Sequence, residues 1–168
     1  MPAYGDLIIL VTPKGKRMMR RLAEGDDIHG NDGVLPASDI AAAEFGQVGF
    51  PSQACPYRLM RPSLYDILKG VKRQTQVLYP KDIGYICVRL GVGNGTTVIE
   101  AGSGSGTLTM ALSWFSGESG HVHTYEARPE FYKLAGRNLE WANLGHNVTR
   151  YNRDIAEGFD QTDADALF

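Results

Sequence analysis

Short apolar runs separated by turn residues dominate the first 60 residues of the chain. Residues 7–11 and 17–22 are two such runs, and the turn sequence Thr-Pro-Lys-Gly-Lys at residues 12–16 lies between them, a pattern typical of a β-hairpin. A region rich in glycine and proline follows over residues 25–56, with a strand candidate at residues 47–50 and few helix signals. The pattern predicts a small β-rich N-terminal domain over residues 1–60.

Helix start signals replace this pattern after residue 60. Ser63 followed by Asp66 forms a capping box, which predicts a helix through Leu68. Asp82 is predicted to cap a second helix that runs to Leu90, just before a glycine.

Strand-like and helical segments then alternate. Apolar or alternating runs at residues 97–101, 121–125 and 148–152 predict strands, and the positions between them have helical spacing. The spaced positions are Leu108, Ala111, Leu112 and Phe115 in one helix and, between Pro129 and Gly145, Phe131, Leu134, Asn138 and Trp141 in the next. This order predicts an α/β fold with a parallel sheet. We place the domain boundary in the interval 58–73 and take residues 61–168 as the second domain.

A glycine loop joins the first of these strands to its helix. Residues 98–109 read Val-Ile-Glu-Ala-Gly-Ser-Gly-Ser-Gly-Thr-Leu-Thr, with the spacing E-x-G-x-G-x-G. A dinucleotide-binding loop would read G-x-G-x-x-G, and Thr107 takes the place of its third glycine. The acid at the strand end repels phosphates but suits the ammonium and sulfonium charges of S-adenosylmethionine. The pattern favours the cofactor loop of a Rossmann-like methyltransferase over an ordinary strand-to-helix turn. Its cofactor-binding candidates are Glu100, Gly102, Ser103, Gly104, Ser105, Gly106 and Thr107.

Acidic residues also follow the next two strands. Glu126 ends the second strand, where a carboxylate can accept hydrogen bonds from both hydroxyls of a ribose. After the third strand, Ile155 is placed to stack on an adenine ring and Asp154 to accept from its exocyclic amine. Each acid alone has a simpler interpretation as a solvated strand end. Three strand ends in register favour one cofactor site.

Composition changes this picture little. The chain is 43% hydrophobic and 21% charged, as expected for a globular protein. It has no apolar run of about 20 residues and no signal-peptide pattern, so we expect a cytoplasmic protein. Cys55 and Cys87 lack the C-x-x-C spacing of a zinc or redox site, which favours two buried thiols and no metal.

The formal net charge of −2 hides an uneven distribution of charged side chains. Residues 1–84 have 11 basic and 9 acidic side chains, whereas residues 85–168 have 6 and 10. Five basic residues lie within eight positions of the predicted hairpin: Lys14, Lys16, Arg17, Arg20 and Arg21. Such a cluster can neutralise the phosphates of a nucleic acid. A solvated hairpin face without a binding role is the equally weighted alternative.

One run of residues carries a family resemblance. Residues 74–84 read Gln-Thr-Gln-Val-Leu-Tyr-Pro-Lys-Asp-Ile-Gly, a pattern more particular than the glycine loop. Together with Arg-Pro-Ser-Leu at 61–64, Gly-Val-Leu-Pro at 33–36 and the loop at 100–106, it resembles the tRNA (adenine-58, N1) methyltransferase family of bacteria and archaea. The resemblance extends from about Gly5 to Phe168.

The resemblance implies a β-rich N-terminal domain, a class I Rossmann-like methyltransferase domain and a homotetramer. It implies methyl transfer from S-adenosylmethionine to N1 of an adenine in the T-loop of tRNA. It assigns cofactor binding to the glycine loop, Glu126 and Asp154, and we add Gln76 to these candidates. By the same resemblance, Tyr79 lies near the reacting methyl group and the target base. A buried aromatic side chain is the alternative for this tyrosine.

One feature departs from the family pattern. In the family, a fourth strand carries the principal acid of the catalytic site, and residues 163–168 begin that strand where the given sequence stops. We therefore expect this acid within two or three residues beyond Phe168, in a longer natural protein. The 168-residue chain alone is then expected to be inactive.

Other classes remain open. A protein methyltransferase of the isoaspartyl type, or a small-molecule methyltransferase, would share the glycine loop and Glu126 but would have no need of the N-terminal domain. A non-catalytic tRNA-binding subunit would need no intact cofactor loop. A nicotinamide enzyme is disfavoured by the loop spacing.

Overall fold

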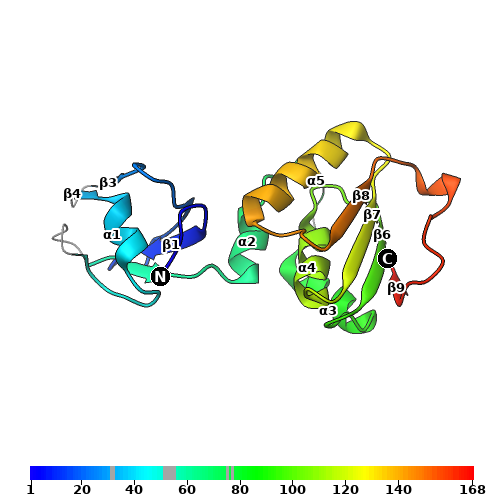
Figure 1. Ribbon diagram of the computed structural model, residues 1–168, viewed down its shortest axis with the longest axis horizontal. Coiled ribbons are helices and arrows are strands. Elements are labelled where there is room, and N and C mark those ends of the chain that lie inside the picture. The colour runs from blue at the N-terminus through cyan, green and yellow to red at the C-terminus, as the bar shows by residue number, and fades with distance from the viewer. Residues whose placement is uncertain (31–32, 51–55, 75, 77) are drawn as a thin grey trace. The chain divides into compact units, whose positions relative to one another are not determined.

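A computed structural model describes residues 1–30, 33–50, 56–74, 76 and 78–168, and the chain forms two compact units (Figure 1). The first unit is Met1–Ser63 and the second is Leu64–Phe168. The division falls inside the interval 58–73, where the sequence pattern changes.

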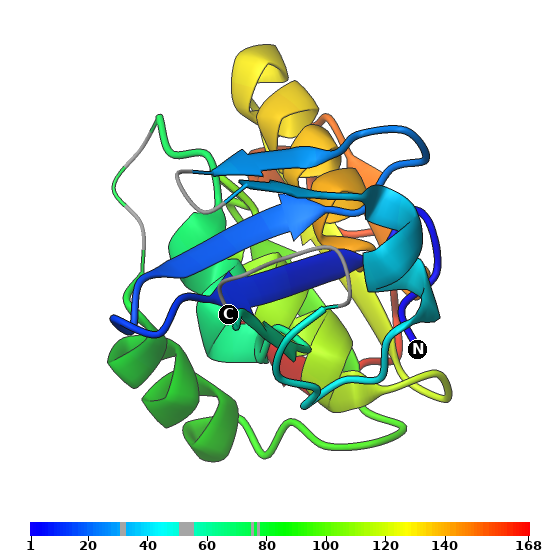
Figure 2. The ribbon, with the colours of Figure 1, turned by 90° about the vertical axis from the view of Figure 1, so that its left-hand side faces the viewer.

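The N-terminal unit is built on an antiparallel sheet in which β1 (Leu7–Val11) lies between β2 (Arg17–Arg21) and β5 (Arg58–Met60). Figure 2 shows β1 and β2 side by side in blue. The predicted hairpin is confirmed, and the amide of Gly15, which has a φ of +80°, donates to the Thr12 carbonyl at 2.8 Å.

Alternate residues of β1 and β5 face the core of this unit, together with the two-stranded sheet of β3 (Ile28–Gly30) and β4 (Gly33–Leu35) and the helix α1 (Ala37–Ala42). The sequence analysis did not predict α1. The buried side chains of the core are Ile8, Leu10, Leu22, Ile28, Leu35, Ala37, Ile40, Ala43, Phe50, Tyr57 and Leu59.

The strand predicted over residues 47–50 is wrong. Only Val48 makes an isolated bridge, to Arg58 of β5. Gly46 and Gly49 have φ angles of +96° and +81°, which are incompatible with a continuous strand.

The second unit alternates helices and strands. Its helices are α2 (Leu64–Gly70), α3 (Pro80–Arg89), α4 (Thr107–Ser116), α5 (Pro129–Ala142) and the short 3-10 helix η1 (Ile155–Glu157). Its strands are β6 (Thr97–Ala101), β7 (His121–Tyr125), β8 (Val148–Tyr151) and β9 (Ala166–Leu167). They form one sheet in the order β8-β7-β6-β9, in which every pair is parallel (Figure 1). The predicted α/β class is confirmed, including a fourth strand within residues 163–168.

Two predicted helix boundaries need correction. Tyr79 is the N-cap of α3 and Pro80 its first residue, so Asp82 lies in the first turn and does not cap the helix. Proline is favoured there because the first helical residue needs no amide donor. Helix α5 ends earlier than predicted, since Asn143 adopts a left-handed φ of +53° at its C-cap, two residues before Gly145.

Among the predicted core positions of α4 and α5, Leu108 and Leu134 are buried, whereas Phe115 is 42% exposed and Trp141 only half-buried. Cys87 is buried, and this burial raises the pKa of its thiol. Cys55 lies outside the described residues. Within the described ranges, no cluster of residues suits a metal ion, and no helix is long and apolar enough to cross a membrane.

Gly106 shows why the loop before α4 requires a glycine. It has a φ of +80°, and a Cβ there would lie 3.2 Å from the Cα of Ala135 in α5. We expect Gly106→Ala to lower the free energy of unfolding by about 1–3 kcal/mol, through backbone strain and crowding. Urea unfolding measures this change.

The control is Gly84→Ala in α3, where no heavy atom lies within 4 Å of the Cβ position. This variant should gain about 0.5–1 kcal/mol, because alanine is the better helix former. If both variants change stability equally, the close packing of Gly106 on α5 is not the cause.

Candidate functional site

The carboxyl ends of β6, β7 and β8 bring the glycine loop and the predicted acids to one edge of the parallel sheet. Two hollows lie there. The first, of about 80 Å³, is lined by Gln76, Leu78, Glu100, Gly102, Ser103, Gly104, Ser105, Thr107, Leu108 and Phe168. The second, of about 200 Å³, is lined by Ala101, Gly102, Tyr125, Glu126, Ala127, Arg128, Arg153, Asp154 and Ile155. Gly102 lines both, so both hollows border the start of the loop.

The glycine loop is tied to the end of β7. The amides of Gly102 and Ser103 donate to the Tyr125 carbonyl at 2.8 and 3.1 Å. Gly102 and Gly104 have φ angles of +95° and +53°, and open space surrounds the Cβ position of Gly102. The loop backbone is therefore exposed to the hollows without a side chain in the way. Gly106 does not line either hollow, and its contact with Ala135 places it in the packing of α4 on α5.

Glu126 connects this loop to the strand end. Its side chain is only 4% exposed, which removes the solvated strand-end interpretation. One carboxylate oxygen accepts from the Gly104 amide at 2.9 Å, and the other accepts from the amide and Nε of Arg128 at 3.1 Å each. The carboxylate thus holds the middle of the loop against the start of α5.

Glu100 is the more deeply buried acid, at 1% exposure. One of its oxygens accepts from the hydroxyls of Thr109 in α4 and Thr124 in β7, both at 2.6 Å. Burial raises the pKa of this carboxyl to about 7, although both threonine hydrogen bonds act in the opposite direction. The charge of Glu126 adds to the increase. Glu100 therefore lines the first hollow as an acid that ionises near neutral pH.

Thr107 adds a second polar group to the first hollow. Its hydroxyl is buried and has no hydrogen-bond partner among the described residues. Buried hydroxyls normally have a partner. An unsatisfied one beside an ionisable carboxyl and an open glycine backbone fits a polar ligand that is itself cationic.

Asp154 and Ile155 line the second hollow together with Glu126, as their positions after consecutive parallel strands predict. The Asp154 carboxylate accepts from the Ala156 amide at 2.9 Å and begins η1. Ile155 is exposed, so its side chain offers an apolar surface to a ligand.

Only part of the segment before α3 lines the first hollow. Gln76 lines the first hollow, whereas Tyr79 does not. The Tyr79 side chain is 55% exposed, so the buried-aromatic alternative is wrong. Thr75 and Val77 of the same run lie outside the described residues.

The structure divides the basic cluster of the hairpin. Lys14 and Lys16 are exposed at the turn, and Arg17 lies just after it. The Arg21 guanidinium donates to the Gly5 carbonyl. Arg20 pairs with Ile8, so it lies on the opposite face of the sheet from Arg17, which pairs with Val11.

Several supporting residues were missed by the sequence analysis. Thr124 is the cross-strand partner of Glu100, and Thr109 comes from the helix that packs on the same face. The Asn138 amide of α5 donates both to the Ser105 carbonyl at 2.8 Å and to the Lys72 carbonyl at 2.9 Å. Asn138 was noted only for its helical spacing, and a polar residue at an apolar position was the available signal.

A parallel sheet with this glycine loop, and with an acid after the next strand, defines the fold of class I Rossmann-like methyltransferases. Solved structures agree. A SAM-dependent O-methyltransferase from Thermotoga maritima matches 99% of this chain and 63% of its own, with a TM-score of 0.84 and 34% identity. The tRNA (m1A58) methyltransferase TrmI from Aquifex aeolicus matches 94% of this chain and 61% of its own, with a TM-score of 0.75 and 32% identity.

The family follows from residues 59–168, which match the model of the GCD14 family, described as tRNA methyltransferase complex GCD14 subunit. The chain belongs to this family, and the predicted resemblance is confirmed. TrmI of Methanocaldococcus jannaschii, a tRNA (adenine(57)-N(1)/adenine(58)-N(1))-methyltransferase, is 43% identical over 132 residues, which are 78% of this chain and 45% of that protein. TrmI of Thermus thermophilus is 34% identical over 137 residues, 82% and 54% of the two chains. The chain spans about half the length of these relatives.

Proposed function

We propose that the protein transfers the methyl group of S-adenosylmethionine to N1 of an adenine in tRNA, at position 58. The observation that carries this proposal is the intact glycine loop, held by Glu126 at the carboxyl edge of the sheet in a chain of the GCD14 family. The relatives named as adenine-58 methyltransferases supply the substrate and the position.

The residues of the two hollows suit this cofactor. Glu100 and Thr107 offer an ionisable carboxyl and an unsatisfied hydroxyl to the cationic methionine end, beside Gln76 and the glycine loop. Glu126 offers the remaining acceptor capacity of its carboxylate to ribose hydroxyls. When bound, S-adenosylmethionine supplies an electrophilic methyl group on a sulfonium.

The adenine end belongs in the second hollow. Ile155 offers an apolar surface for a ring and Asp154 a carboxylate for an exocyclic amine. The Tyr125 ring stacks on Tyr151 at 4.4 Å between centroids, and its hydroxyl donates to Gln161. These contacts hold the segment that carries Asp154 against the sheet.

Methylation of adenine N1 makes modest chemical demands on the protein. The nitrogen has a free lone pair, so no strong base is required and the main task is alignment. The base must leave its stack to expose this edge. We propose that Tyr79, exposed and three residues from Gln76, contacts the target base there.

The proposal also includes a homotetramer, which the family resemblance implies, and a cytoplasmic location, which agrees with relatives that act on tRNA. Light scattering of the purified protein tests the first, and the site of the protein in fractionated cells tests the second.

We expect the full-length natural protein to transfer labelled methyl groups to unmodified tRNA, with 1-methyladenosine as the only labelled nucleoside in mass spectrometry. A tRNA in which uridine replaces the adenine at position 58 should take up no label, because N1 of that adenine is the proposed acceptor. Label on an oxygen atom, in protein or in a small molecule would overturn the proposal.

This product analysis also decides between the proposal and a second candidate. The Thermotoga structure is that of a SAM-dependent O-methyltransferase, so transfer to oxygen is the competing reaction. A non-catalytic subunit is the other alternative, and cofactor titration by calorimetry tests it, because such a subunit has no use for the intact loop.

A further inference from the structure

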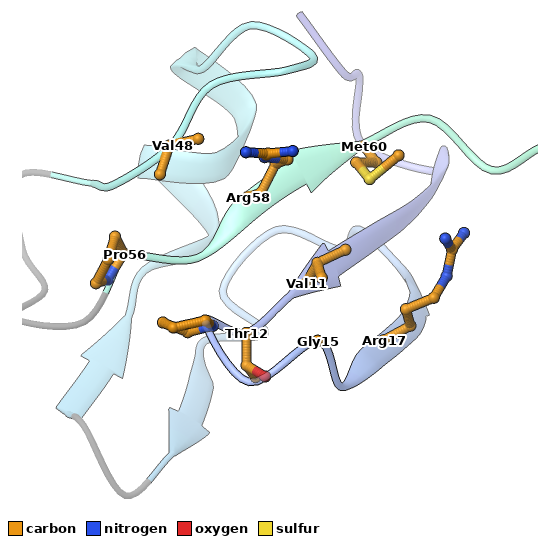
Figure 3. A pocket seen from close by; sticks show the side chains of 9 residues that line it. Val11, Thr12, Gly15, Arg17, Val48, Pro56, Arg58 and Met60 are labelled. Carbon is orange, nitrogen blue, oxygen red and sulfur yellow. The ribbon is translucent and has the colours of Figure 1, made fainter.

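A third hollow lies in the N-terminal unit and shares no lining residue with the proposed cofactor site (Figure 3). It has a volume of about 500 Å³, within the range of roughly 300–1,000 Å³ typical of ligand sites. It is lined by Val11, Thr12, Pro13, Gly15, Arg17, Val48, Pro56, Arg58 and Met60. The sequence analysis did not single out Arg58, Met60 or Pro56.

The sheet register explains this combination of residues. Val11 of β1 pairs with Arg17 of β2 on one side and with Arg58 of β5 on the other. Val48 bridges to Arg58 from beyond β5. Because directly paired residues point to the same face, Arg17, Val11, Arg58 and Val48 form one row across the sheet. Figure 3 shows the two arginines on either side of Val11.

This row lies at the turn end of the sheet face opposite to the core cluster, and Ile9, the next residue of β1 on that face, is itself buried. Ile8, Leu10 and Leu59, on the opposite face, are buried in that core. Val48 is 53% exposed, and Arg17 and Arg58 are both exposed. Among the described residues, none makes a hydrogen bond or ion pair with the Arg58 guanidinium, so this charge is available to a ligand.

The charged side chains of the three strands and of the hollow's described lining are all basic. The three strands carry four arginines and no acidic residue, and none of the described lining residues is acidic. Lys14 and Lys16 add two exposed amines at the adjoining turn. The region therefore complements a polyanion. The base faces of a duplex are hidden by stacking, whereas an unpaired strand presents base faces that can pack on an apolar surface such as Val11, Val48 and Met60.

We propose that this hollow holds an unpaired nucleotide of an RNA strand, with phosphates on Arg17 and Arg58 and the base against Val11, Val48 and Met60. The inference rests on the proposed function in one respect, which is the choice of RNA as the polyanion that binds here. It replaces the five-residue basic cluster by a site on one sheet face, which includes Arg58 and leaves out Arg20.

The test is the binding of labelled oligouridylate to the protein, followed by fluorescence anisotropy. This RNA contains no adenine, so the measurement is independent of methyl transfer. We expect Arg58→Gln to weaken binding about 3–10-fold at about 0.15 M salt, and to reduce the slope of log affinity against log salt by about 0.7. Val48→Glu puts a carboxylate in the row at an exposed position. It should weaken oligouridylate binding at least as much as Arg58→Gln does.

Two matched variants separate this site from general attraction. Arg137→Gln removes an exposed arginine of α5 and should leave the affinity within about twofold, since Arg137 does not line the hollow. Arg20→Gln removes the same charge from the opposite face of β2, so its effect should be clearly smaller than that of Arg58→Gln. Circular dichroism and the Tm of each variant check that it folds, and Arg58→Lys, which keeps the charge, should bind better than Arg58→Gln.

Equal losses in Arg20→Gln and Arg58→Gln would overturn the inference, as would duplex RNA that binds as tightly as oligouridylate. The two proposals fail separately. If the full-length natural protein does not methylate tRNA while oligouridylate binding depends on Arg58, the proposed function falls and the RNA site stands. If Arg58→Gln leaves oligouridylate binding unchanged while 1-methyladenosine is formed, the site falls and the proposed function stands.

Discussion

Glu100→Gln is expected to raise the free energy of unfolding above pH 7 by as much as about 3 kcal/mol, because the natural carboxyl must ionise while buried. Its pKa is raised by burial from 4.5 to about 7. Between these values the folded protein holds a proton that the unfolded chain has released. The stability that Glu100 contributes is therefore complete below pH 4.5 and is lost as the pH rises through about 7.

Urea unfolding over this pH range checks the sign. The natural protein should lose stability as the pH rises, and the Glu100→Gln protein should lose less, since the amide keeps an acceptor for Thr109 and Thr124. Glu130→Gln, at an exposed position in the first turn of α5, is the control and should leave the slope unchanged. A Glu100→Gln protein whose stability falls as steeply as that of the natural protein would show that Glu100 does not titrate in this window.

Glu126→Ala is expected to weaken the binding of S-adenosylmethionine about 10–150-fold, which corresponds to the roughly 1.5–3 kcal/mol of a charge-assisted hydrogen bond. The substitution removes the proposed contact with the ribose. It also leaves the Gly104 amide and the Arg128 guanidinium without the carboxylate that holds them. Calorimetric titration of the cofactor measures the loss.

Glu126→Gln separates the two contributions. It keeps one acceptor oxygen for either the loop or the ribose, so its affinity should fall between those of the natural protein and Glu126→Ala. Unchanged cofactor affinity in the alanine variant would remove Glu126 from the site.

The meeting of the candidate residues at one edge of the sheet could be predicted from the sequence because they are close to strand ends. The strand before the glycine loop, the acid after β7 and the Asp154-Ile155 pair after β8 each have a local pattern. Parallel strands bring such ends to one edge, so the assembly in space needed no further information.

The supporting contacts could not be predicted in this way. Thr124 lies beside Glu100 through the register of β6 on β7, and no local pattern sets that register. Arg58 joins the row of Arg17 and Val11 through the pairing of β1 with β5, which are far apart in the chain. The two wrong helix boundaries, at Asp82 and Gly145, have a simpler cause. In each case a second residue with the same preference, Pro80 for a helix start and Asn143 for a helix end, lies nearby and marks the true boundary.

Asn138 has a consequence for how the proposed site is held together. One side-chain amide links the Ser105 carbonyl of the glycine loop to the Lys72 carbonyl, four residues before Gln76. One nitrogen of α5 therefore anchors both the glycine loop and the chain that precedes Gln76. Loss of this single amide would release two segments of the proposed site from the same helix.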